Sequence, residues 1–308
     1  MGQYRAQFIS MILMTALGVG MFVGFNMEWK SIEYDMMSFL SDCNYADYRL
    51  VSEKGYSADD LDKIADIDGV DDAARYICVT ADIKGKDGDS AALTVTGKES
   101  VSGFLVMSGE KYDAQSRDGV WLSDRYASLN NFSVGDDITF SYKGIEISGK
   151  VKGLIKSAEQ LICVRDETQL MPDFSTHGFA YISPVMYEEA TGLDFYPQIN
   201  VISSLDDKDF SEKVSDALGT TEVILTKEDT VSYSEAKGEV DEGKAMGSVL
   251  PALFLLIALL TMVTTMHRLT AKEKTQIGTL KALGFHDSRI VFHYTSYALA
   301  IAIVGSLL

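Results

Sequence analysis

Three long apolar runs, separated by polar stretches of very different length, organise this sequence. The first is residues 8–25, eighteen residues without a charge, and the others are residues 246–266 and 290–308. A helix crosses the roughly 30 Å hydrocarbon core of a bilayer with about 17–25 residues of this kind. We therefore predict three membrane helices at these positions.

The first run has an alternative interpretation as a cleaved secretory signal, because Arg5 precedes it. It is longer than the usual apolar region of a signal, about 7–15 residues, and N-M-E at 26–28 is no small-residue cleavage site. We predict an uncleaved span. Within it Ala16, Gly20 and Gly24 recur every fourth residue. This spacing lets two helix backbones approach closely, so we predict that the first span packs against another helix along this stripe.

The third run differs from the other two at its end. It contains His293 and Tyr294 near its start and reaches the last residue without a polar flank. We expect this span to be truncated and the natural protein to be longer.

Charge in the short connections predicts the orientation. The loop 267–289 contains five Lys or Arg and two acidic residues, and the N-terminal segment 1–7 contains Arg5. Basic short loops remain on the cytoplasmic side. We therefore expect a multi-pass protein of the cell membrane, with residues 1–7 and 267–289 cytoplasmic and residues 26–245 extracytoplasmic.

Residues 26–245 contain both helical and strand patterns. Ser57 can cap a helix that we expect to end at Gly69, and a strand follows it. Asp87-Gly88 predicts a hairpin turn, and alternation around Lys143-Gly144 predicts a second hairpin in a small antiparallel sheet. Residues 198–226 are typical of strand, capped helix and strand, a βαβ or split βαβ element.

The polar stretch 227–247 then predicts a helix that leads directly into the second span as a stalk. The predicted fold class is a membrane α-helical protein with a large α+β extracytoplasmic domain inserted between its first and second spans. The chain is long enough for this domain to have a full core of its own.

Charge and composition narrow the range of possible functions. The net charge is −18, and residues 27–246, with 21 basic and 43 acidic residues, carry −22. A domain this acidic repels nucleic acid and anionic headgroups, so we expect no nucleic-acid partner; solubility alone also accounts for the charge. The three cysteines, Cys43, Cys78 and Cys163, cannot pair completely, and the sequence leaves one disulfide open.

Enzymatic chemistry is not indicated. The sequence has no G-x-x-x-x-G-K-[ST] loop for ATP, its four histidines are scattered, and no His/Cys group has zinc spacing. We therefore expect no catalytic residues, no metal and no cofactor in this chain.

The loop 267–289 is the most informative segment. Ile277, Leu280 and Leu283 follow helical spacing and predict one apolar face on a short helix. Gly284 is placed to end that helix in a left-handed cap, and Asp287 to cap the third span. The periodicity leaves two interpretations open: a helix lying in the headgroups, or a coupling helix that inserts into a partner protein.

The string E-K-T-Q-I-G-T-L-K-A-L-G-F, residues 273–285, resembles the cytoplasmic signature after the second membrane helix of the FtsX-like permease family, which includes MacB-type exporters. The order of span, large domain, span, loop and span is also similar. The family's fourth helix is missing here. The resemblance implies an ATPase-coupling site, and we assign to it Lys272, Glu273, Gln276, Ile277, Gly278, Leu280, Lys281, Ala282, Leu283 and Gly284.

The resemblance implies a permease subunit of an ABC transporter, whose separate ATPase subunit drives export or extraction of an amphiphile such as a peptide, lipoprotein or drug. It implies two further partners, membrane lipid and a second permease module or copy, in a protein of four or about ten membrane helices. One alternative is a transmembrane regulator that gates an extracellular cell-wall hydrolase. Another is a sensor-type receptor that dimerises.

Overall fold

The computed structural model describes residues 5–166, 169 and 171–307. Its contacts divide the chain into two compact units, which we call the membrane unit, within residues 5–35 and 238–307, and the sheet domain, Met36–Lys237. The first four residues of the predicted N-terminal segment and the last residue of the predicted third span lie outside the described residues. Each unit is described by itself.

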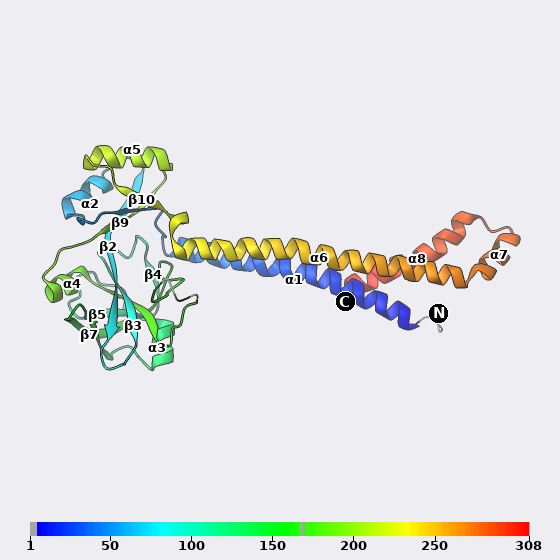
Figure 1. The fold of residues 1–308 in the computed structure, drawn as a ribbon, viewed down its shortest axis with the longest axis horizontal. Coiled ribbons are helices and arrows are strands. Elements are labelled where there is room, and N and C mark those ends of the chain that lie inside the picture. The colour runs from blue at the N-terminus through cyan, green and yellow to red at the C-terminus, as the bar shows by residue number, and fades with distance from the viewer. Residues whose placement is uncertain (1–4, 167–168, 170, 308) are drawn as a thin grey trace. The chain divides into compact units, whose positions relative to one another are not determined.

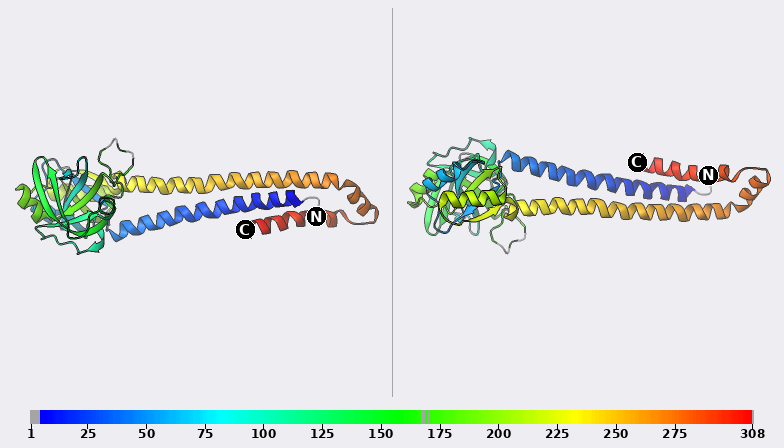
Figure 2. Two further views of the ribbon diagram at one scale, coloured as in Figure 1. Left: turned by 90° about the horizontal axis from the view of Figure 1, so that it is seen from below. Right: turned by 90° about the horizontal axis from the view of Figure 1, so that it is seen from above.

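Long helices form the membrane unit (Figure 1). Three described helices are long and apolar enough to cross a membrane: α1 (Arg5–Asp42), α6 (Val231–Lys272) and α8 (Asp287–Leu307). A short helix, α7 (Lys274–Ala282), connects α6 to α8. As far as its residues are described, each predicted apolar run lies within one of the three long helices. The membrane parts of α1 and α6 lie side by side in both views of Figure 2.

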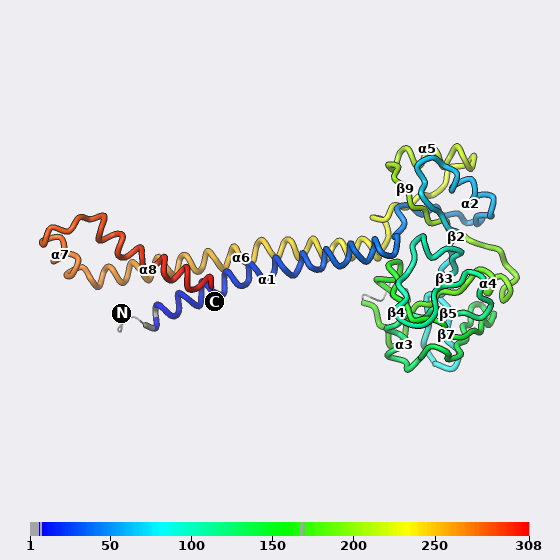
Figure 3. The backbone as a smooth tube through the Cα atoms, turned by 180° about the vertical axis from the view of Figure 1, so that it is seen from behind, coloured from blue at the N-terminus to red at the C-terminus, as the bar shows by residue number. Residues whose placement is uncertain are grey.

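The sheet domain lies in the chain between α1 and the membrane part of α6, and its path can be followed in Figure 3. Its strands are β1 (Tyr48–Val51), β2 (Val70–Ile83), β3 (Ser90–Thr96), β4 (Phe104–Gly109), β5 (Gly119–Ser123), β6 (Asp137–Tyr142), β7 (Ile145–Ser157), β8 (His177–Ile182), β9 (Gln198–Ser203) and β10 (Val223–Thr226). Its helical elements are α2 (Ala58–Ala65), α3 (Asp124–Asn130), α4 (Pro184–Thr191), α5 (Asp207–Leu218) and a 3-10 turn at Lys227–Asp229. This confirms the predicted class of membrane helices with an inserted α+β domain.

Six of these strands pair in a ring. The pairing runs β2-β3-β8-β5-β7-β6, and β6 returns to the end of β2, where Ile83 lies opposite Phe140. Two pairings, β3 with β8 and β5 with β7, are parallel. Leu93, Leu122 and Phe140 are among the fully buried side chains of the apolar core that these strands share. The predicted small antiparallel sheet is therefore wrong in size and in direction, because distant strands join the two hairpins into one mixed sheet.

A second core forms where β1, β9 and β10 meet α2 and α5. Tyr48 stacks on Phe210 with ring centroids 4.0 Å apart, and Ile64 and Ile199 are fully buried beside them. The long strand β2 belongs to both halves of the domain, because it pairs with β9 up to Tyr76 and with β3 beyond it. One strand therefore contributes to both halves of the domain.

The local turn predictions are confirmed. Strands β2 and β3 form a hairpin whose turn contains Gly88 at φ +85°, and β6 and β7 form a hairpin through Lys143 and Gly144, both at positive φ. Such a pair of left-handed residues matches the twist of a two-residue hairpin. Strand β1 lies between β9 and β10 and is antiparallel to both, so the β9-α5-β10 element is the split form of βαβ.

Helix α2 begins as predicted but ends earlier. Ser57 accepts a hydrogen bond from the Asp60 N–H, and the Asp60 carboxylate accepts one from the Ser57 N–H. The helix ends at Ala65, so the prediction that Gly69 ends it is wrong. Gly69 instead has φ +100° in the turn just before β2, and its carbonyl accepts a hydrogen bond from Ser203.

The buried histidine of β8 makes the stability of the sheet domain depend on pH. His177 Nδ1 lies 2.8 Å from Ser90 Oγ, while Nε2 has no hydrogen-bond partner among the described residues. Burial lowers the pKa of His177 below its ordinary value. The unfolded chain therefore takes up a proton that the folded domain resists, and stability falls as pH drops below about 6.5, by up to about 1.4 kcal/mol per pH unit.

Urea unfolding between pH 7.5 and 5 measures this effect. Trp121 is fully buried in the sheet domain, and Trp29 is the other tryptophan, so Trp121 reports alone in a Trp29→Phe background. We expect His177→Gln, which can still bond Ser90, to flatten the pH dependence between pH 6.5 and 5. An equal slope in both proteins would show that other groups cause it.

Candidate functional site

The predicted coupling residues lie together at the turn between α6 and α8. Lys272 is the last residue of α6, Glu273 lies in the junction, and Gly284 follows the end of α7. Helix α7 carries the predicted positions Gln276, Ile277, Gly278, Leu280, Lys281 and Ala282, and Leu283 caps it. Ile277 and Leu280 are half-buried and Leu283 is 71% exposed, so the predicted apolar face is partly exposed.

The end of α7 is a complete Schellman motif. Gly284 has φ +84°, the left-handed conformation predicted for it. Its N–H donates to the Lys281 carbonyl at 3.0 Å, and the Phe285 N–H donates to the Leu280 carbonyl at 3.1 Å. These two bonds satisfy carbonyls that the helix end leaves open and turn the chain sharply toward α8.

Side-chain contacts tie both ends of α7 to α8. The Tyr294 hydroxyl donates to the Glu273 carboxylate at 2.6 Å, and Lys281 Nζ lies 2.7 Å from Asp287. Asp287 is in the first turn of α8, and the prediction that it caps this helix is wrong: the Arg289 and Ile290 N–H groups donate to the His286 carbonyl. Sequence reasoning missed Tyr294, whose role depends on the fold of the loop.

Within the described residues, the two glycines of the predicted stripe on α1 have no close neighbour. Gly20 and Gly24 are exposed, and a Cβ at either position would meet nothing within 4 Å; Ala16 is half-buried. The close approach of α1 uses its other face. A Cβ at Gly18 would lie 3.1 Å from the Leu255 side chain of α6. Ala16, Gly20 and Gly24 are thus available to a further helix, and packing along them stays a prediction.

A second small-residue pair, which the sequence reasoning missed, lies on α6. Gly243 and Gly247 face Trp29 of α1, and a Cβ at Gly243 would lie 2.8 Å from the tryptophan Cβ. Lys244 between them contacts Glu33 at 2.7 Å and lies over the Trp29 ring. The G-x-x-x-G spacing was a readable signal for this helix contact.

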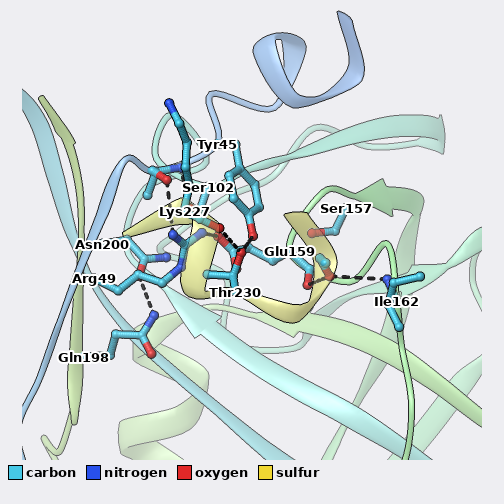
Figure 4. Close-up of polar contacts among 12 residues, drawn as sticks. Tyr45, Arg49, Ser102, Ser157, Glu159, Ile162, Gln198, Asn200, Lys227 and Thr230 are labelled. Atoms are coloured by element: carbon cyan, nitrogen blue, oxygen red, sulfur yellow. Dashed lines mark hydrogen bonds and ion pairs between the residues drawn. The ribbon is translucent and has the colours of Figure 1, made fainter. Parts of the chain in front are cut away.

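A buried polar cluster lies in the sheet domain where α1 ends and α6 begins. We call it the helix-root cluster and define it as Tyr45, Arg49, Glu159, Thr230 and Ser232, of which Figure 4 labels the first four. Arg49 Nη2 lies 2.5 Å from Glu159 Oε1, and the guanidinium lies 4.5 Å from the centre of the Tyr45 ring. The Tyr45 hydroxyl lies 2.8 Å from Thr230 Oγ1.

The same cluster holds the first turn of α6. Ser232 donates its hydroxyl to the Glu159 carbonyl at 2.8 Å and accepts from the Ile162 N–H at 3.3 Å. Nearby, Lys227 contacts Asp47 at 2.9 Å. The root of α6 is therefore fixed to the segment that follows β7 by hydrogen bonds in both directions.

Burial controls the charges of the cluster. The Arg49 side chain is 4% exposed and that of Glu159 is 10% exposed. Burial alone would lower the pKa of Arg49, but the Glu159 carboxylate outweighs it and raises the pKa above its ordinary value. Burial raises the pKa of Tyr45 to about 12, with Glu159 adding to the effect. Arg49 is thus charged and Tyr45 neutral across the physiological range.

Sequence reasoning missed this cluster, because its members are up to 187 positions apart and meet only in the folded domain, as Tyr45 and Ser232 show. One signal was present. Arg49 interrupts the apolar strand that became β1, and a charge in a buried strand requires a partner. The sequence did not identify Glu159 as that partner.

The fold and these contacts define a polytopic membrane protein whose sheet domain is tied to the roots of two long helices. Residues 248–308 match the family model described as FtsX-like permease C-terminal. The matched part of the chain contains α7 and its Schellman turn, and the match confirms the predicted resemblance to the FtsX-like permease family.

Two solved structures are similar to this chain. One is the extracellular domain of the noncanonic ABC-type transporter YknZ from Gram-positive bacteria, with 13% identity and a TM-score of 0.43, over 59% of this chain and 98% of that one. The other is the periplasmic region of MacB from Actinobacillus actinomycetemcomitans, with 12% identity and a TM-score of 0.43, over 67% and 98%. No curated protein matches the sequence.

Proposed function

We propose that this chain is a permease subunit of an ABC transporter. The match of residues 248–308 to the FtsX-like permease C-terminal family carries this proposal. A separate ATPase subunit would bind the chain at α7 and supply the ATP hydrolysis. The cargo would be an amphiphile such as a peptide, a lipoprotein or a drug, and a second permease copy or module would complete the transporter.

The exposed apolar face of α7 supports an ATPase site there. Leu283, the residue that caps this nine-residue helix, is 71% exposed and could be buried in a partner. The contacts of Glu273 with Tyr294 and of Lys281 with Asp287 hold the helix at both ends. A partner that moves α7 would therefore move the adjoining ends of α6 and α8 with it.

The continuity of α6 supports a mechanical relay. This helix runs from Val231 to Lys272 without a break, about 60 Å at 1.5 Å per residue. Pro251 lies inside it, so its remaining backbone bonds and its contacts with α1 must keep it continuous. Its first residues belong to the helix-root cluster. We propose that displacement of the α7 end is transmitted along α6 to this cluster.

The proposed orientation follows from the basic loop. Residues 267–289 would face the cytoplasm, where ATP is present, and residues 26–245 would face the outside. The amphiphile would then be handled by the sheet domain outside the membrane, and α7 would meet the ATPase inside. The N-terminal segment would be cytoplasmic with α7.

Copurification tests the ATPase site. We expect affinity purification of the full chain from its native membrane to recover a P-loop ATPase, and Leu280→Asp to lose it, because a carboxylate would be forced into the apolar contact. Thr275→Asp is the matched control, since Thr275 is exposed and lies about 200° around α7 from Ile277.

The two variants separate the competing interpretations. Loss of the ATPase from Leu280→Asp alone supports the coupling face. Retention by both variants would favour a helix that lies in the headgroups. Reproducible recovery of a secreted cell-wall hydrolase without any ATPase would favour the regulator and overturn the transporter.

A further inference from the structure

A cavity of about 370 Å³ opens in the sheet domain beside the helix-root cluster. Its apolar wall consists of Phe39 from the last turns of α1, Leu161, Phe174 and Phe179 from β8. The volume is at the lower end of the range of pockets that bind small molecules, about 300–1,000 Å³. These four side chains come from three separate parts of the chain, so the cavity exists only in the folded domain.

Two basic side chains line the pocket, although the domain as a whole is acidic. Arg125 of α3 and Lys156 of β7 line it, together with one carboxylate, Asp124. Lys156 Nζ lies 3.7 Å from Asp124, which balances one charge. Within the described residues no carboxylate lies within 4 Å of the Arg125 guanidinium, which is 5.6 Å from the centre of the Phe174 ring.

The acidic charge of the surrounding domain restricts the anions that this pocket can bind. Residues 27–246 carry −22, so an anion is repelled by the domain as a whole and needs local cations to bind. An apolar wall with Arg125 and Lys156 beside it offers an alkyl chain a dry surface and an anionic head a charge-assisted hydrogen bond. Ser157 and Gln160 supply further polar groups.

We propose that this pocket binds a free single-chain amphiphile with an anionic head, a carboxylate or a phosphate. The chain lies against Phe39, Phe174 and Phe179, and the head contacts Arg125. The identification of such an amphiphile as the cargo rests on the proposed function. Its binding in the pocket does not. The small volume favours one chain over the two chains of a bilayer lipid.

The position of the pocket links it to the relay. Ser157, Gln160 and Leu161 line it, while Glu159 in the same short segment holds Arg49 and, through its carbonyl, Ser232. A molecule that displaces Leu161 therefore acts on the segment that fixes the root of α6.

Photolabelling of the full chain tests the proposal. The protein is placed in phosphatidylcholine nanodiscs, without nucleotide or ATPase, and exposed to dodecyl phosphate that bears a diazirine at the chain end. We expect adducts on Phe39, Leu161, Phe174 or Phe179. Dodecyl phosphate and laurate should compete, whereas neutral dodecyl maltoside and inorganic phosphate should not.

Arg125→Gln should lower labelling about tenfold or more, as expected for loss of a charge-assisted contact. Arg117→Gln is the control, because Arg117 is a surface cation paired with Glu189 and does not line the pocket. Trp121 emission, measured in a Trp29→Phe background, checks that both variants fold. Equal labelling of Arg125→Gln and wild type, or equal competition by dodecyl maltoside, would overturn the proposal.

A bilayer source is distinguished by a second set of nanodiscs that contain phosphatidylglycerol. If this lipid abolishes labelling while laurate fails to compete, the pocket holds a bilayer lipid and the proposal is wrong. Because no ATPase is present, adducts can form even if α7 binds none. The experiment therefore tests ligand binding in the pocket separately from the proposed permease function.

Discussion

Replacing Arg49 with alanine is expected to lower the free energy of unfolding of the sheet domain by about 3–5 kcal/mol. The variant leaves the Glu159 carboxylate, 10% exposed, without the cation that lies 2.5 Å from it. It also removes the guanidinium from the Tyr45 ring. Urea unfolding of the full chain in nanodiscs, followed by Trp121 emission in a Trp29→Phe background, measures the change.

A paired substitution separates charge from packing. In Arg49→Met with Glu159→Met no buried charge remains, and the Glu159 carbonyl can still accept from Ser232. We expect this double variant to recover most of the lost stability, because apolar groups often replace a buried ion pair at little cost. If it is as unstable as Arg49→Ala, the loss comes from packing and the uncompensated charge is not its cause.

The stability of this cluster also bears on the proposed relay. A helix can transmit displacement to a domain only if the end of the helix is firmly attached to that domain. The ion pair of Arg49 and Glu159, together with the bonds of Ser232, supplies such a fixed point. Moderate loosening at Thr230, which holds Tyr45, should therefore weaken the relay before it unfolds the domain.

Local features of the fold were predictable from the sequence, and long-range ones were not. Asp87-Gly88 and Lys143-Gly144 identify their hairpins because a tight turn needs residues that tolerate positive φ, which is a local property. Three uninterrupted apolar runs identify the membrane helices in the same way. The return of β6 to β2 depends on strands more than fifty residues apart, and no turn residue encodes it.

The candidate sites divide along the same line. The proposed coupling residues 272–284 form one contiguous stretch, so periodicity and a family signature were enough to propose them. The helix-root cluster and the pocket draw residues from several distant segments, among them Phe39, Glu159 and Phe174. A single sequence shows which residues could form such sites but not which of them lie close together. For the helix-root cluster, the charge of Arg49 within an apolar strand was the one signal in the sequence.

Replacing Gly284 with valine is expected to uncouple ATP hydrolysis from the sheet domain while membrane insertion stays normal. Gly284 has φ +84°, a conformation that costs an L-residue about 1–2 kcal/mol and a β-branched one more. The strain would break the bond from the Phe285 N–H to the Leu280 carbonyl and change the direction in which α7 leads into α8. The ATPase would still bind and hydrolyse ATP, but its movement would no longer reach α6.

Hydrogen exchange in the reconstituted complex provides the measurement. We expect ATP to change the exchange of residues 231–237, at the root of α6, in the wild type and to have no effect there in Gly284→Val. Gly284→Asn is the matched control, because asparagine tolerates the left-handed conformation and should preserve the response. An ATP response in Gly284→Val equal to that of the wild type would mean that the Schellman turn holds α7 without any part in coupling, and the relay would then have to pass through the Glu273–Tyr294 contact instead.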